Sequence, residues 1–295
     1  MPTWKPESLA PAGIVTMHPR AVLGIDAAWT ATQPSGIALV VETGSGWRLV
    51  TAQASYQRFL AAAYGHPAEP RPAGCVPDVP ALLAACTQLH ANGPDLVAVD
   101  MPLSLHPITA RRPCDNLLSQ AYAARHCGTH SPTAVRPGPI SDALRAGFTA
   151  AGYTLATSGQ PRRALIEVYP HPALLELAGA AKRLPYKAGK TSLYWPALTR
   201  GERKLRLLAE WRRIISLLDT KISGTAASLP PPPPDASALE LKAYEDRMDA
   251  VVCAWIGICA LNGEAVSFGD TTSAIWVPQP THRLLTSPAA PSPDA

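Results

Sequence analysis

The segment 22–29 places an aspartate at the end of a short apolar run, and this feature constrains the fold more than any other. The run Val22 to Ile25 has the pattern of a buried strand, and Asp26 ends it. A buried carboxylate is costly unless it is paired, hydrogen-bonded or bound to a metal. Three further acids lie at or near the ends of apolar segments, namely Asp100, Glu167 and Asp249. We therefore expect these four acids to meet in one site assembled from distant segments.

The order of the predicted elements indicates an α/β protein. Strands are expected over residues 21–27, 35–42 and 46–54, and the turn signal between the last two predicts an antiparallel meander. A helix over 78–90 leads to a strand over 95–100, and a helical crossover usually lays such a strand parallel to an earlier one. Sheets of this kind gather their ligands at the carboxyl ends of the strands, where two of the four acids are expected.

The rest of the chain is expected to be one domain, residues 21–278, with additions. Residues 102–162 are rich in Pro, Gly, Arg and Ser, so we expect a loop-rich insertion over the functional edge of the sheet. Five consecutive prolines predict an exposed linker over 229–235. A disordered leader and tail are expected over 1–20 and 279–295. The other predicted elements are a helical piece, a strand, three helices and a hairpin, over 115–125, 164–169, 172–177, 203–218, 237–261 and 264–277.

Composition and charge favour a cytoplasmic protein. The hydrophobic content of 47% is ordinary for a globular chain, and the net charge of +4 permits a polyanionic partner without requiring one. The six cysteines show no zinc-ligand spacing and no disulfide framework, which favours a reducing compartment. The longest apolar run, Ala250 to Leu261, is too short to span a bilayer. We expect no membrane association and no obligate protein partner.

Four acids at one edge of a sheet suit a pair of divalent metal ions. Mg²⁺ and Mn²⁺ are hard cations that prefer carboxylate oxygens, and two of them about 3.5–4 Å apart can activate a water and stabilise a leaving oxygen. Asp26 is expected to bridge the metals, Asp100 and Glu167 to hold one each, and Asp249 to complete the site. An aspartate after a strand is also commonly a turn or helix-cap residue, so the pattern alone leaves that alternative open.

Two further acids share a helix face with Asp249. Asp246 and Glu245 precede it by three and four residues, which places all three side chains on one side of the predicted last helix. Either residue could assist Asp249 or replace it as a metal ligand.

Seven motifs resemble, in this order, the domain-of-unknown-function family 429. They are GIDAAW (24–29), AVDMPLS (98–104), RRPCD (111–115), IEVYPHP (166–172), LPYK (184–187), EDRMDAVVCAW (245–255) and GDTTSAIWVP (269–278). The resemblance covers roughly residues 21–278; IEVYPHP and RRPCD are its most specific parts, while many RNase H-like proteins share GIDAAW. It implies an RNase H-like fold, with a mixed five-stranded sheet flanked by helices and its first three strands antiparallel. It also implies a nuclease whose acidic cluster is Asp26, Asp100, Glu167 and Asp249.

Four basic residues are candidates for contacts with a substrate. Arg111 and Arg112 could bind a phosphate in a bidentate manner, or they could anchor a loop through salt bridges. His171 could relay a proton, although its two flanking prolines equally indicate a rigid turn. Lys187 could reach a scissile phosphate.

These patterns together predict a metal-dependent nuclease that hydrolyses DNA or RNA. One alternative is a nucleotide-binding phosphotransferase of the actin and sugar-kinase type, but the chain lacks the second glycine-rich phosphate loop of those proteins. Another alternative is a non-catalytic binding or scaffold protein. Basic doublets occur in the second half of the chain with few aromatic residues near them, so base stacking is not indicated.

Overall fold

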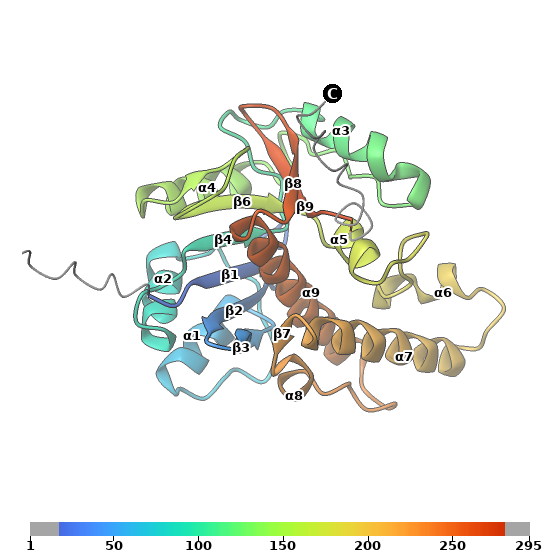
Figure 1. The fold of residues 1–295 in the computed structure, drawn as a ribbon. Helices are drawn as coiled ribbons and strands as arrows, with labels where there is room; N and C mark the ends of the chain where they lie inside the picture. The colour runs from blue at the N-terminus through green and yellow to red at the C-terminus, as the bar shows by residue number, and fades with distance from the viewer. Residues whose placement is uncertain (1–17, 281–295) are drawn as a thin grey trace, which may run out of the picture.

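The computed structural model describes residues 18–280, which form a mixed α/β fold around one sheet (Figure 1). The strands are β1 (Ala21–Asp26), β2 (Gly36–Thr43), β3 (Gly46–Gln53), β4 (Leu96–Val99), β5 (Thr154–Leu155), β6 (Ala164–Val168), β7 (Ile222–Ser223), β8 (Ala265–Gly269) and β9 (Ala274–Pro278). The α-helices are α1 (Tyr56–Tyr64), α2 (Val79–Leu89), α3 (Pro113–Tyr122), α4 (Pro139–Ala150), α5 (Pro170–Leu177), α6 (Thr191–Tyr194), α7 (Arg200–Asp219), α8 (Thr225–Ser228) and α9 (Ala238–Leu261). The expected leader and tail lie almost entirely outside the described residues.

The sheet has nine strands in the order β7-β3-β2-β1-β4-β6-β9-β8, with β5 beside β6. The predicted meander is confirmed, because β1, β2 and β3 pair antiparallel. The crossover is confirmed as well, since β4 runs parallel to β1, and β6 in turn runs parallel to β4. The predicted closing hairpin is β8–β9, and β9 pairs with β6 in parallel. The sheet is therefore larger than the five strands that the resemblance implied.

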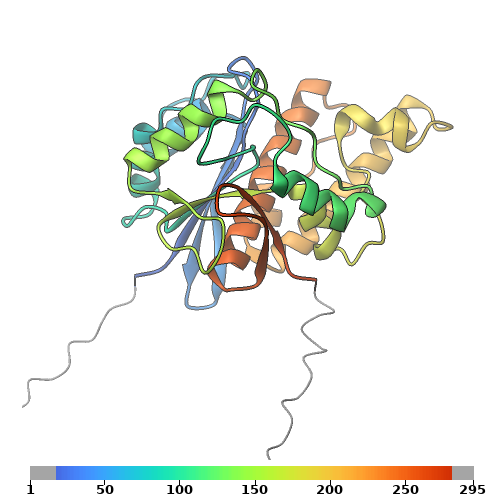
Figure 2. The ribbon, with the colours of Figure 1, turned by 90° about the horizontal axis from the view of Figure 1, so that it is seen from above.

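Helices cover both faces of the sheet. Figure 2 shows the sheet edge-on between α1, α2 and α4 on one side and α9 and α7 on the other. Successive residues of a strand point to opposite faces. Accordingly, Val22 and Ala98 belong to the hydrophobic cluster that contains α9, whereas Leu23 and Val97 belong to the cluster that contains α1 and α2. Each face of β1 and β4 is therefore buried, which explains why these strands are apolar at nearly every position.

Helix α9 lies directly on β1 and β2 because glycines face it. A Cβ atom built on Gly24 would overlap the backbone carbonyl of Ala250, and one built on Gly36 would overlap the backbone carbonyl of Asp246. Side chains at these two positions would push the helix away from the sheet. The close approach brings the N-terminal half of α9 over the carboxyl end of β1.

The segment 102–162 contains more regular structure than expected. Besides α3, which matches the predicted helical piece, it contains α4 and the short strand β5. Helices α1, α6 and α8 and strand β7 were also not expected. The prolines after Leu229 are mostly exposed, as expected, but Leu229 itself is buried and its carbonyl accepts a hydrogen bond of 3.0 Å from the Tyr244 hydroxyl. Within residues 18–280, no helix combines the length and the hydrophobicity needed to cross a bilayer.

Replacing Gly24 by Ala should destabilise the protein by about 1–3 kcal/mol, because the added methyl group forces α9 and β1 apart. The free energy of unfolding, measured by denaturant titration, checks this. Gly44→Ala is the matched control: Gly44 lies in the exposed β2–β3 turn, a Cβ there meets nothing within 4 Å, and its effect should stay within about 0.5 kcal/mol. Equal effects of the two substitutions would contradict the close approach.

Candidate functional site

Asp26 and Asp100 lie side by side at the carboxyl ends of the neighbouring strands β1 and β4. The strands pair Ile25 with Val99, and the Asp100 amide donates a hydrogen bond of 2.8 Å to the Ile25 carbonyl. Asp26 also pairs with Gly36, which faces α9, so the Asp26 carboxylate is directed toward that helix. Both aspartates are partly exposed. The structure therefore places these two acids next to each other at the edge of the sheet, as expected.

Helix α9 adds three acids and one lysine to this place. The helix begins with a capping box, in which Ser237 and Glu240 satisfy each other's backbone amides. Four charged residues of α9 lie three or four positions apart and therefore share one face of the helix, namely Lys242, Glu245, Asp246 and Asp249. The three acids are buried, and Asp249 is 0% exposed.

Two lysines partly neutralise these acids. The Lys187 ammonium lies 2.5 Å from Asp249 Oδ2 and 3.4 Å from Glu245 Oε1. The Lys242 ammonium lies 2.5 Å from Asp246 Oδ1 and 3.2 Å from Glu245 Oε1. Within the described part of the chain, Asp249 Oδ1 and Asp246 Oδ2 are buried without any hydrogen-bond partner. The carboxylates are thus only partly satisfied by the protein.

The site carries more negative charge than its lysines balance. Five carboxylates and two ammonium groups leave three formal negative charges when all are ionised. Burial raises the pKa of Asp26, Asp246 and Asp249 to about 6 each. Burial, together with repulsion from Asp26 and Asp249, raises the pKa of Asp100 well above its usual value. A cation bound here would relieve this repulsion.

Glu167 lies apart from the α9 acids, although it lines a smaller cavity together with Asp100 and its repulsion contributes to the raised pKa of that carboxyl. It pairs with Val99 rather than with Asp100, so the alternation along the strand directs it to the face opposite α9. Both of its oxygens accept hydrogen bonds from Arg112, at 2.6 and 2.7 Å, and the Leu103 amide donates a third at 2.7 Å. Its carboxylate is therefore already satisfied, in contrast to those beside α9.

Arg112 is a buried anchor, which matches the second of the two interpretations of the RRPCD motif. Besides Glu167, its guanidinium donates to both oxygens of Asp115, at 3.0 and 2.9 Å, and to the Leu103 carbonyl at 2.8 Å. All five of its N–H donors are thus in use. Pro113 and Asp115 begin α3, with the Asp115 carboxylate accepting from the Arg112 amide.

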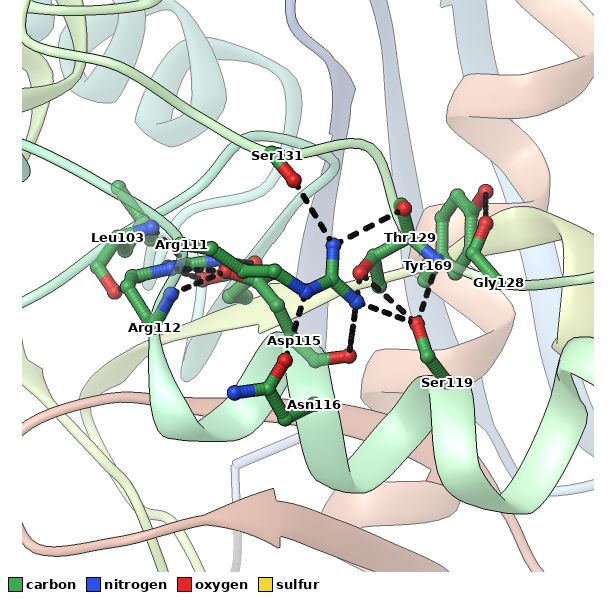
Figure 3. Close-up of polar contacts among 11 residues, drawn as sticks. Leu103, Arg111, Arg112, Asp115, Asn116, Ser119, Gly128, Thr129, Ser131 and Tyr169 are labelled. Carbon is green, nitrogen blue, oxygen red and sulfur yellow. Dashed lines mark hydrogen bonds and ion pairs between the residues drawn. The ribbon is translucent and has the colours of Figure 1, made fainter.

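Arg111 is also an anchor, and it joins α3 to the following loop (Figure 3). It donates to Asn116, to Ser119 and to the Asp115 carbonyl on α3, at 2.7, 2.7 and 2.8 Å. It also donates to the Thr129 carbonyl at 3.3 Å and to the Ser131 hydroxyl at 3.1 Å. Neither arginine has an N–H left for a phosphate in this conformation.

His171 lies beside Arg183 rather than among the acids. Its Nε2 atom is 2.5 Å from the Arg183 guanidinium, and its buried Nδ1 atom has no partner within residues 18–280. Burial, followed by repulsion from Lys187 and Arg183, lowers the pKa of His171 well below its usual value. The ring is therefore neutral at pH 7, and a proton-relay role stays a prediction.

A cavity of about 690 Å³ opens above Asp26 and Asp100. Asp246 and Lys242 from α9 also line it. The rest of the lining comes from the loop that follows α3 and from the residues just after β1, including His130, Ser131, Thr133, Arg136 and Trp29. The sequence did not single out these wall residues. Lys242 could have been found from its spacing of three and four residues to Glu245 and Asp246, whereas nothing local marks Arg136.

The acids suit a divalent cation that is held by few protein ligands. Among residues 18–280, no group of three or more His, Cys, Asp or Glu side chains is arranged to hold a metal ion. Mg²⁺, however, keeps several waters and is commonly bound by one or two carboxylates together with a substrate phosphate. The adjacent pair Asp26 and Asp100, with an unpartnered oxygen of Asp246 nearby in the cavity wall, fits that pattern of binding.

The fold and the acidic cavity thus define a mixed α/β protein with a candidate site at the carboxyl ends of two parallel strands. The model of the family described as "Protein of unknown function (DUF429)" matches residues 24–274, and the chain belongs to this family. Searches of curated proteins and of solved structures found no match.

Replacing Arg112 by Met should destabilise the protein by about 3–5 kcal/mol, because Glu167 and Asp115 would remain buried without their partner. Denaturant unfolding measures the effect. Arg162→Met, at an exposed position, is the control and should change stability by less than about 0.5 kcal/mol. A small effect of Arg112→Met would contradict the anchor role.

Asp26→Asn should stabilise the protein at pH 7.5 in metal-free buffer by about 1–2 kcal/mol, because it removes a carboxylate whose ionised form is disfavoured first by burial and then by repulsion from Asp246. The folded-state pKa of Asp26 is about 6, above its ordinary value of 3.8, so the wild type takes up a proton and gains stability as the pH falls through 6. The advantage of the variant should therefore shrink toward pH 5. Thermal unfolding across this range tests both statements, and a variant less stable than wild type at pH 7.5 would refute them.

Proposed function

We propose that this protein is a metal-dependent nuclease that hydrolyses phosphodiester bonds of nucleic acid with bound Mg²⁺ or Mn²⁺. The observation that carries the proposal is the pair Asp26 and Asp100 at adjacent strand ends, facing an open cavity with a surplus of negative charge. Protein folding alone does not favour such a cluster, since the buried carboxylates repel one another. Clusters of perturbed acids in a cleft are typical of functional sites.

The arrangement of the central strands supports an RNase H-like core. The five strands β3-β2-β1-β4-β6 are consecutive in the sheet, the first three along the chain are antiparallel, and β4 and β6 are parallel to β1. This is the arrangement that the family resemblance implies. The remaining strands extend the sheet at its edges or lie beside β6, so they leave this core intact.

Asp26 and Asp100 would hold the cation, with Asp246 or Asp249 assisting through an unpartnered oxygen. When bound, such an ion supplies activation of a water and stabilisation of charge on the phosphate. We propose one cation at this site rather than a bridged pair, because Arg112 already occupies both oxygens of Glu167.

The other charged groups of the chain have supporting roles in this proposal. Lys187 and Lys242 reduce the repulsion among the α9 acids and so keep them ionised near the cation. His130 lines the cavity, and burial together with repulsion from Lys190 and Arg183 lowers its pKa. Its ring is therefore neutral at pH 7 and able to accept a proton from an attacking water.

Manganese-dependent cleavage of labelled single-stranded, duplex, hybrid and branched DNA and RNA tests the proposal. Asp26→Asn keeps the shape of the side chain and removes its charge, so the cleavage rate should fall by about 10²–10³-fold. Asp235→Asn, at an exposed position outside the cavity, should cleave like wild type. Mn²⁺ should also raise the melting temperature of wild type and of Asp235→Asn, but not that of Asp26→Asn.

Each other outcome favours a different protein class. Absence of cleavage together with binding of ATP would favour the phosphotransferase alternative. Absence of both cleavage and metal-induced stabilisation would favour a non-catalytic scaffold.

A further inference from the structure

Arg136 and Lys242 are the lysine and arginine side chains that line the cavity within residues 18–280. Lys242 is already engaged by Glu245 and Asp246. Within residues 18–280, the Arg136 guanidinium makes no hydrogen bond or ion pair, although its backbone does. It lies 5.8 Å from the centre of the Trp29 ring, and both side chains line the cavity. The donors of Arg136 are therefore free to bind an anion that enters the cavity.

The wall that carries Arg136 is held in place by the protein itself. The Arg136 amide donates to the Thr133 hydroxyl at 3.0 Å, and the Thr133 amide donates to the Arg136 carbonyl at 2.8 Å. Arg111 fixes the preceding part of the loop through Thr129 and Ser131, as Figure 3 shows. Since the backbone is fixed before any ligand arrives, little ordering of this loop opposes binding.

Trp29 comes from the loop that follows β1. It follows Asp26 by three residues and is only partly buried, so part of the indole is accessible from the cavity. Aromatic rings stack with the face of any nucleobase, and a guanidinium contributes cation–π attraction. An aromatic platform therefore stands close to the acids, although the sequence indicated no base stacking near its basic doublets.

We propose that Trp29 and Arg136 bind one unstacked nucleobase and its adjacent phosphate, which makes a single-stranded segment the substrate of the proposed nuclease. The inference rests on the proposed function only for the reaction that follows, because it concerns the binding of the strand. A cavity of about 690 Å³ has the size of pockets that enclose small molecules, about 300–1,000 Å³. In a duplex the faces of the bases are covered by stacking, so they cannot reach the indole. A free strand exposes them.

The charges of the cavity favour different places for two neighbouring phosphates. Phosphate is repelled by Asp26, Asp100 and Asp246, and it is attracted by Arg136. One phosphate would contact Arg136 while the neighbouring, scissile phosphate lies at the cation held by Asp26 and Asp100. The base between them would then stack on Trp29.

Binding of a fluorescent oligothymidylate of about eight nucleotides, in Ca²⁺ without Mg²⁺ or Mn²⁺, tests the inference by anisotropy. Wild type should bind it more tightly than a blunt duplex of the same labelled strand. Trp29→Ala should weaken binding roughly 5- to 150-fold, the range seen when a stacking platform is removed, whereas Trp29→Phe should retain most of the affinity. Arg136→Ala should weaken it roughly 10-fold or more and reduce the salt dependence, since a phosphate contact is lost.

The controls separate this inference from the proposed function. Arg162→Ala, at an exposed position outside the cavity, should bind like wild type. Competition by thymidine monophosphate distinguishes a site for free nucleotides from a site for strands. Complete competition at concentrations similar to those of the oligonucleotide would indicate a free-nucleotide site and contradict the inference. Cleavage of nucleic acid by wild type with unchanged binding by Trp29→Ala and Arg136→Ala, or tighter binding of the duplex, would overturn the inference and leave the nuclease proposal standing. Loss of binding in both variants, without cleavage by wild type, would support the binding inference and overturn the nuclease proposal.

Discussion

The direct contact of α9 with β1 and β2 determines where the charged residues of this protein meet. Because Gly24 and Gly36 have no side chains, the backbone of the helix rests on the backbone of the strands. The contact sets Asp246 and Asp249 beside the carboxyl end of β1, where Asp26 and Asp100 already lie next to each other. A helix held one side chain farther away would separate the three acids of α9 from Asp26 and Asp100. The site is thus a consequence of backbone packing as much as of the acids themselves.

The acids around Arg112 and the acids of α9 differ in whether their oxygens have hydrogen-bond partners. This difference distinguishes a structural network from a candidate binding site. Glu167, Asp115 and the Leu103 carbonyl accept from all five N–H groups of the Arg112 guanidinium, so this arginine has no donor left for a ligand. Beside α9, Asp246 and Asp249 each keep an oxygen without a partner among residues 18–280. Buried polar groups are normally satisfied, so an unsatisfied group requires an explanation. Binding of a cation supplies one, and the complete network around Arg112 needs none.

The sequence predicts the order of the sheet better than it predicts the site. The first three strands and the crossover to β4 follow from apolar runs and turn residues, which act locally. Helix α4 was not predicted, because it lies in a segment rich in proline and glycine that its tertiary contacts stabilise. At the site, the face of the sheet to which the Glu167 side chain points depends on the pairing of Glu167 with Val99. A register shift of one residue would turn this side chain to the other face. Register between distant strands is not encoded in local pattern, and neither is the approach of Arg136 to Trp29.

The insertion between β4 and β6 supplies part of the lining of the open cavity at the acidic sheet edge. The edge alone would present its carboxylates to solvent. Arg112 joins the start of α3 to Glu167 on β6, and Arg111 joins α3 to the following loop, from which Arg136 lines the cavity. The two arginines of the RRPCD motif therefore hold the insertion in place and have no donor left for a substrate. In the proposed function, the sheet and α9 would supply the chemistry, while Arg136 of the insertion together with Trp29 would bind the substrate.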